Sequence, residues 1–145
     1  MKSAIVTGVS GQDGAYLARL LLGKGYHVHG TIRSSGGGGG WRLRELGISD
    51  HQHLHVEPFD LGNAVAATEI VERVQPDEIY NLAGQSSAVA SLSDPVGTAQ
   101  VNALGPLYIL EAIRQTRPGT RFFQAGSAEL FGNAEQVPQS ESTPF

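Results

Sequence analysis

Three glycines near the N-terminus have the spacing of a phosphate-binding turn. Gly8, Gly11 and Gly14 stand between an apolar, β-branched run at 2–7 and an apolar-periodic segment at 15–22, which predicts a strand, a tight turn and a helix. We expect Gly8 to permit the sharp turn, Gly11 to leave backbone N–H groups open to a pyrophosphate, and Gly14 to let the helix pack against the strand. The N–H groups of the first helical turn would face the anion. An ordinary surface turn is the alternative.

A serine and a glutamate follow the last predicted strand of the chain, at 121–125. In an open α/β sheet, ligands bind at the carboxyl ends of the strands. Ser127 and Glu129 are therefore the best candidates for catalysis. Their i, i+2 spacing in an extended or turn segment can direct both side chains into one pocket.

Strand and helix patterns alternate along the whole chain. Strands are expected at 2–7, 26–32, around 51–56, at 78–83 and at 121–125. Helices are expected from 15, at 41–46, at 67–74 with Asn63 as N-cap, and from Asp94-Pro95 to about 115. The alternation predicts an α/β fold, a Rossmann-like, doubly wound parallel sheet with helices on both faces, in one domain over 1–145.

The residues after the second predicted strand bear on cofactor choice. An acidic side chain there would bind the ribose hydroxyls of NAD, but the sequence has Arg33-Ser34-Ser35. A cation and two hydroxyls suit a 2′-phosphate, so NADP is predicted; a solvated loop arginine is the alternative. Asp60, after the third strand, can reach the adenine amino group.

Small and polar residues after the fourth strand complete the predicted site. They let the backbone approach a cofactor, and Ser86 could contact a sugar or phosphate. The remaining residues assigned to cofactor binding are Gln12, Asp13, Leu61, Leu82, Ala83, Gln85 and Val101.

Two features allow more than one interpretation. His51, His53 and His55 would share one face of a strand and could hold a metal, although an edge or solvent-facing strand start is preferred and no metal is predicted. Pro106 interrupts the long predicted helix and should free the carbonyl of Asn102, leaving either a water anchor or a simple kink. The helix face is predicted to carry Val101, Leu104, Tyr108 and Ala112.

Five successive glycines, 36–40, resemble a mobile linker or a placeholder for unidentified residues. They are followed by a short amphipathic segment that begins at Trp41.

Composition excludes several function classes. The 145 residues carry a net charge of -4, with 40% hydrophobic and 7% aromatic residues, so a nucleic-acid surface is not expected. There is no cysteine, no apolar run near the ~20 residues of a membrane span and no leader-like N-terminus. A cytoplasmic protein that binds small anionic metabolites is expected.

Five segments together resemble the GDP-mannose 4,6-dehydratases of the extended short-chain dehydrogenase/reductase superfamily: GVSGQDGAYL from Gly8, WRLRELGI from Trp41, EIYNLAGQS from Glu78, SAELFG from Ser127 and TPF from Thr143. The Gln12-Asp13 pair is the more specific part.

The resemblance implies an NADP-dependent conversion of GDP-D-mannose to GDP-4-keto-6-deoxy-D-mannose. Hydride leaves C4, a base removes the C5 proton, water leaves from C6 and the hydride returns to C6. Glu129 would be the base, and Ser127, where the family has threonine, would hydrogen-bond the C4 oxygen. A homo-oligomer, dimer or tetramer, is implied for the full-length parent.

Two departures qualify the resemblance. Only Arg33 stands where the family has an arginine-rich loop, and the family's Y-x-x-x-K segment and GDP-sugar domain would lie beyond Phe145. We therefore expect residues 1–145 to be an incomplete, NADP-binding portion that is inactive alone. Another nucleotide-sugar epimerase or reductase and a non-catalytic NADP-binding module are the alternatives.

Overall fold

The computed structural model describes residues 1–33 and 40–145. Its centre is a five-stranded sheet in the order β3-β2-β1-β4-β5, and every pairing is parallel. The strands are β1 (Ser3–Thr7), β2 (His27–Ile32), β3 (Leu54–Pro58), β4 (Glu78–Asn81) and β5 (Arg121–Gln124). Ser34, Ser35 and the glycines at 36–39 lie outside the described residues.

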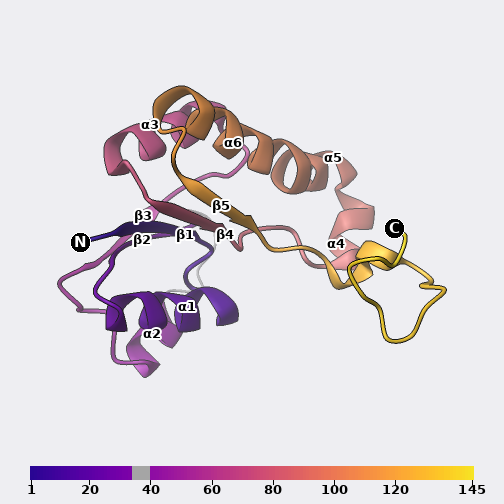
Figure 1. Ribbon diagram of the computed structural model, residues 1–145, viewed down its shortest axis with the longest axis horizontal. Helices are drawn as coiled ribbons and strands as arrows, with labels where there is room; N and C mark the ends of the chain where they lie inside the picture. Colours follow the sequence, from indigo (N-terminus) through magenta and orange to yellow (C-terminus); the bar gives the residue numbers. More distant parts are fainter. Residues whose placement is uncertain (34–39) are drawn as a thin grey trace.

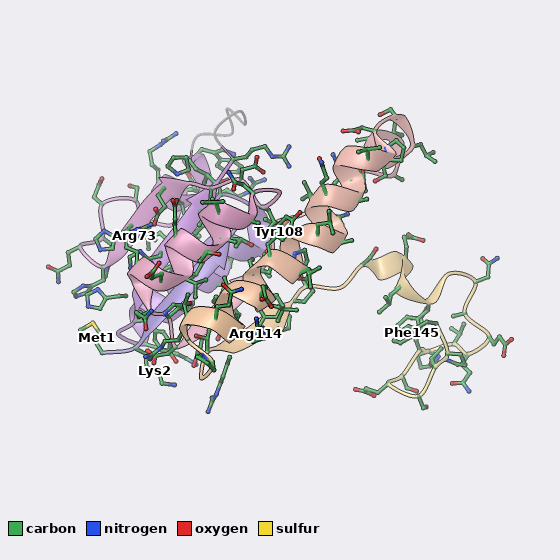
Figure 2. The ribbon with its side chains drawn as sticks, turned by 90° about the horizontal axis from the view of Figure 1, so that it is seen from above. Met1, Lys2, Arg73, Tyr108, Arg114 and Phe145 are labelled. Atoms are coloured by element: carbon green, nitrogen blue, oxygen red, sulfur yellow. The ribbon has the colours of Figure 1, made fainter. Side chains whose placement is uncertain are left out.

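Helices cover both faces of this sheet (Figure 1). One face carries α1 (Gln12–Gly23) and α2 (Trp41–Glu45), and the other carries α3 (Ala64–Val74) and α6 (Gly105–Thr116). Beyond them lie α4 (Ala88–Ser93), α5 (Pro95–Ala99), the π-helical segment η1 (Gln100–Leu104) and the 3-10 turn η2 (Ala128–Phe131). Figure 2 shows the segment ending at Phe145 projecting away from the sheet. The predicted doubly wound fold is confirmed.

The alternation of side chains along β1 divides the core into two layers. Ala4 and Val6 pack with the buried residues of α1, whereas Ile5 packs with those of α3 and α6. Burial on both faces explains why the three central residues of β1, Ala4, Ile5 and Val6, are all apolar.

The strand order reverses at β1, because β2 lies on one side of it and β4 on the other. The carboxyl end of β1 is therefore the topological switch point, where open α/β sheets bind ligands.

Two predicted capping signals are confirmed. The Asn63 side chain accepts hydrogen bonds from the N–H groups of Val65 and Ala66 at the start of α3. Asp94 accepts one from Gly97 N–H, with Pro95 as the first residue of α5. These side-chain acceptors fix where both helices begin.

The long helix expected from Asp94 is not regular, and the predicted interruption takes the form of the π segment η1. Gly105 N–H donates to Gln100 O, five residues back, just before Pro106, which has no N–H to donate. The wider turn changes which side chains face the sheet. Leu104, predicted to be on the inner face, is exposed, and Gly105 and Ile109 are buried instead.

The third strand, which was predicted around 51–56 and includes the alternating histidines, begins and ends later in the structure. β3 begins at Leu54, and His51 and His53 lie in the preceding turn, which Leu54 N–H closes by donating to His51 O at 2.8 Å. Only His55 is in the strand. β3 is an edge strand, as preferred, and no group of three or more metal-ligating side chains occurs within 1–33 and 40–145.

Glycines allow close approach at two points around the first turn. A Cβ on Gly14 would lie 2.8 Å from Val9 Cα, and a Cβ on Gly30 would lie 2.6 Å from Val9 Cγ1. Both distances are below van der Waals contact, so α1 and β2 approach the β1 turn only because these positions lack side chains.

Gly14→Ala should therefore lower the free energy of unfolding by about 1–3 kcal/mol, because the methyl group meets the rigid backbone of Gly8 and Val9. Urea unfolding would measure the change. Gly23→Ala is the matched control, since Gly23 is also in α1 but has nothing within 4 Å of its Cβ position; it should stabilise by about 0.4–1 kcal/mol. Equal effects of the two substitutions would contradict the packing role of Gly14.

Candidate cofactor and substrate clefts

The glycine turn has the geometry of an anion site. Gly8 adopts φ 70°, and Gly11 N–H donates to Gly8 O at 2.9 Å, which closes the turn. Gly11 is also the N-cap of α1 and provides no side-chain acceptor. The N–H groups of the first turn of α1 are thus left without a capping side chain, which suits a phosphate.

A cleft of about 430 Å³ opens between this turn and the ends of β2, β3 and β4. Most of the predicted cofactor residues line it: Gly8, Gly11, Arg33, Asp60, Leu61, Leu82, Ala83 and Val101.

Arg33 and Asp60 line this cleft just after the carboxyl ends of β2 and β3, respectively. Phe59 N–H donates to Ile32 O at 2.8 Å, which holds the exits of the two strands together. The Asp60 carboxylate accepts a hydrogen bond from Gly62 N–H at 2.9 Å. Arg33 is exposed and supplies a cation where β2 ends.

Four predicted cofactor residues do not line this cleft, and one of them, Gln85, lines a second cleft instead. Gln12 lines a smaller hollow of about 270 Å³ together with Trp41 and Arg42. Asp13 is exposed in the first turn of α1, and Gly14 is buried behind the turn. Gly14 therefore acts through packing alone.

A second cleft, of about 810 Å³, adjoins the first at Leu82, Ala83 and Gly84, which line both. The remaining predicted site residues line this second cleft: Gln85, Ser86, Ser127 and Glu129. Leu82, Ala83 and Gly84 thus separate the cleft that holds the candidate catalytic pair from the cleft beside the glycine turn.

Ser127 and Glu129 are held by the start of η2. Ser127 Oγ accepts a hydrogen bond from Glu129 N–H at 3.1 Å, so the serine caps this short turn. The hydroxyl proton of Ser127 remains available to a ligand, and both residues are exposed. Within the described residues no hydrogen bond or ion pair of the Glu129 carboxylate is found.

A buried hydrogen-bond network, which sequence reasoning missed, supports the floor of both clefts. Thr7 Oγ1 donates to Asn81 Oδ1 at 2.6 Å and accepts from the N–H groups of Leu82 and Ala83, each at 3.0 Å. Asn81 Nδ2 donates to Gln124 Oε1 at 2.7 Å. Thr7 and Asn81 are both 0% exposed. The sequence does contain a signal for this network, namely a polar residue at the end of an otherwise apolar strand.

Asn102 holds the loop that follows β4. Its Oδ1 accepts from Gln85 N–H at 2.8 Å and its Nδ2 donates to Gln85 O at 2.9 Å. The π segment η1, which contains Asn102, is thereby fixed to the wall shared by the two clefts. The sequence pointed only to the backbone carbonyl of this residue, and its side chain was missed.

The parallel sheet, the glycine turn at its switch point and the adjoining clefts define a Rossmann-like domain of the short-chain dehydrogenase/reductase type. Residues 5–145 match the family model described as GDP-mannose 4,6 dehydratase. The chain belongs to this family.

Curated relatives agree along the whole chain. It is 43% identical to a GDP-mannose 4,6-dehydratase of Yersinia enterocolitica over 100% of this chain and 40% of the relative, and 41% identical to GDP-mannose 4,6 dehydratase 2 of Caenorhabditis elegans over 99% and 40%. The chain thus spans less than half the length of these relatives.

Solved structures share the fold. The Bordetella bronchiseptica enzyme WbmH in complex with NAD+ superposes with a TM-score of 0.81 at 25% identity, covering 99% of this chain and 45% of that one. The Campylobacter jejuni UDP-Glc/GlcNAc 4-epimerase superposes with a TM-score of 0.85 at 19% identity, covering 99% and 43%. In the described part of the chain, no helix is both long and apolar enough to cross a membrane.

Thr7→Val should lower the free energy of unfolding by about 2–4 kcal/mol, because it leaves Asn81 Oδ1 and two backbone N–H groups without their partner. Chemical denaturation would measure the loss. Thr68→Val is the matched control: its hydroxyl donates to Ala64 O on the exposed side of α3, and its effect should stay within about 0.5 kcal/mol. A small effect at Thr7 would show that the network does not support the sheet edge.

Proposed function

We propose that these residues form the cofactor-binding and acid–base portion of an NADP-dependent GDP-mannose 4,6-dehydratase, a carbon–oxygen lyase. One observation carries the proposal: Glu129 and Ser127 line a cleft that shares a wall with the cleft beside the glycine turn, in a chain whose residues 5–145 match this family. Because the relatives are longer, the activity is proposed for an enzyme of their full length.

The shape of the first cleft supports a dinucleotide. The uncapped N-terminus of α1 suits the pyrophosphate, and the cleft continues from there to Asp60 at the exit of β3. NAD+, with which the WbmH enzyme forms its complex, is a ligand of the same class. Arg33 favours NADP, since a guanidinium attracts a 2′-phosphate that an acidic residue would repel.

Bound in this cleft, the nicotinamide would supply hydride acceptance from C4 of the hexose and hydride return to C6. The hydroxyl of Ser127 can donate its proton to the C4 oxygen while it accepts a hydrogen bond from Glu129 N–H. Glu129 takes the C5 proton, which a C4 ketone makes acidic, and passes it to the hydroxyl group that leaves C6, so that water is released. Ser86, on the same cleft, contacts the sugar or phosphate of GDP-mannose.

Glu129 also separates this proposal from the epimerase alternative. Inversion at C4 needs removal and return of a C4 hydride but no base at C5. A carboxylate in the cleft therefore favours elimination over epimerisation.

Two further expectations remain predictions. Homo-oligomer formation, as dimer or tetramer, rests on the family resemblance. A cytoplasmic location rests on the sequence alone.

Cofactor choice can be measured by calorimetric titration with NADP and NAD. The wild-type protein should bind NADP more tightly, and Arg33→Asp should reverse the order, because loss of the charged contact costs about 1–3 kcal/mol. Arg19→Asp is the matched control, since it makes the same charge change on an exposed position of α1. Equal affinity of the wild-type protein for both dinucleotides would contradict the role of Arg33.

The role of Glu129 can be measured as solvent deuterium entering C5 of the product in the full-length enzyme. Glu129→Gln should abolish this incorporation, a loss of about 10²–10⁴-fold for a missing general base, and leave NADP affinity within about threefold. Glu135→Gln, an exposed position outside the lining of the second cleft, should retain wild-type exchange. Incorporation at the wild-type rate in Glu129→Gln would remove Glu129 from the mechanism.

A further inference from the structure

All five histidines of the chain gather at the outer edge of the sheet. His27 and His29 come from β2, His55 comes from β3, and His51 and His53 come from the turn before β3. The ring centroids of His27 and His53 are 4.4 Å apart, those of His51 and His53 are 5.7 Å apart, and those of His29 and His55 are 5.1 Å apart. We call these five residues the histidine cluster.

Little negative charge faces this cluster. Glu57 on β3 faces His29, but it already pairs with Arg73 of α3. Glu57 Oε1 is 3.7 Å from His29 Nδ1, too far for a hydrogen bond, and this buried nitrogen has no other partner within the described residues. Asp50, next to His51 in sequence, is contacted by Ser49 Oγ at 3.4 Å.

Protonation of His29 and His53 is therefore unfavourable in the folded chain. Burial, and then the neighbouring His55, hold the pKa of His29 below its ordinary value of 6.5. Burial, and then His27 and His51, lower the pKa of His53 as well. Since the folded pKa values lie below the unfolded ones, this part of the stability is fully present above pH 6.5 and is lost as the pH falls below it.

β3 is the element that this repulsion would displace. It is an edge strand, and among the described residues it pairs with β2 alone. Its ladder ends where Phe59 N–H bonds to Ile32 O. The residues that follow, Phe59, Asp60 and Leu61, line the first cleft. Gly8, Ser10 and Gly11 of the glycine turn line the same cleft.

We propose that the histidine cluster is an acid-sensitive latch, which releases β3 from β2 on protonation and so weakens dinucleotide binding from the adenosine end of the cleft. The binding part rests on the proposed function, whereas the release of β3 does not. No covalent change is involved, and neutral pH restores the latch.

Hydrogen exchange tests the release directly. Corrected for the chemical exchange rate, amides of β3 should lose protection by more than about tenfold relative to those of β1 between pH 7.5 and 5.5. The double variant His27→Gln/His53→Gln should reduce that loss to less than about threefold. Glu69→Gln, an exposed change on α3, should behave as the wild-type protein. If β1 amides of the double variant are unprotected at pH 7.5, this variant is not folded, and the single variant His55→Gln replaces it. Its β3 amides should lose less protection between pH 7.5 and 5.5 than those of the wild-type protein.

Titration with NAD tests the consequence, since NAD lacks the 2′-phosphate that itself titrates near pH 6. The dissociation constant of the wild-type protein should rise by about five- to tenfold from pH 7.5 to 5.5, and that of the histidine variant by about twofold or less. Equal pH dependence in the wild-type and variant proteins, in exchange or in binding, would overturn the latch. Absence of any dinucleotide binding at pH 7.5 would instead overturn the proposed function, and the exchange experiment would still decide the release of β3.

Discussion

The hydrogen bond from Thr7 to Asn81 joins the carboxyl ends of β1 and β4, and the two clefts lie at these ends. The register aligns Thr7 with Thr31 on one side and with Asn81 on the other, and Asn81 in turn with Gln124. A row of polar side chains therefore closes the carboxyl ends of four adjacent strands. A slip of one residue in any of these strands would put an apolar side chain opposite a buried hydroxyl or amide, so the row fixes register as well as stability.

The two clefts depend on this row in different ways. Leu82 and Ala83 donate their N–H groups to Thr7 and form the wall common to both clefts. Gln124 ends β5, directly before the loop that carries Ser127 and Glu129. The candidate base is thus connected through three hydrogen-bonded side chains to the strand that begins the glycine turn.

Much of this arrangement follows from sequence because it depends on local patterns. The glycine spacing, the Asn63 and Asp94 caps and the alternation of elements each act within a few residues, and each is found where expected. The helix from Pro95 departs from expectation because a π turn before Pro106 changes its buried face, and periodicity assumes one constant repeat. The histidine turn departs because a period of two at three positions does not distinguish a strand from a turn closed by one backbone hydrogen bond.

The site residues also fall into two groups: those that a local pattern predicts and those that depend on contacts distant in sequence. Ser127 and Glu129 follow a strand, and their placement needed only the rule that parallel strands share a carboxyl edge. Asn102 and Gln124 are polar residues whose partners lie in other elements, 17 residues away for Gln85 and 43 for Asn81. One sequence does not reveal such pairs. Gln12 and Asp13 occupy the turn in sequence, yet the direction of α1 keeps both out of the first cleft.

The contact between Val9 and Gly30 has a consequence for comparing members of this family. The Val9 side chain fills the space that a Cβ at position 30 would need, so the two positions share one fixed volume between the turn and β2. A relative with a larger residue at position 30 must have a smaller one at position 9, or a turn displaced from the sheet. Substitutions at these positions should therefore be correlated across the family, although the residues are 21 apart and lie in different elements.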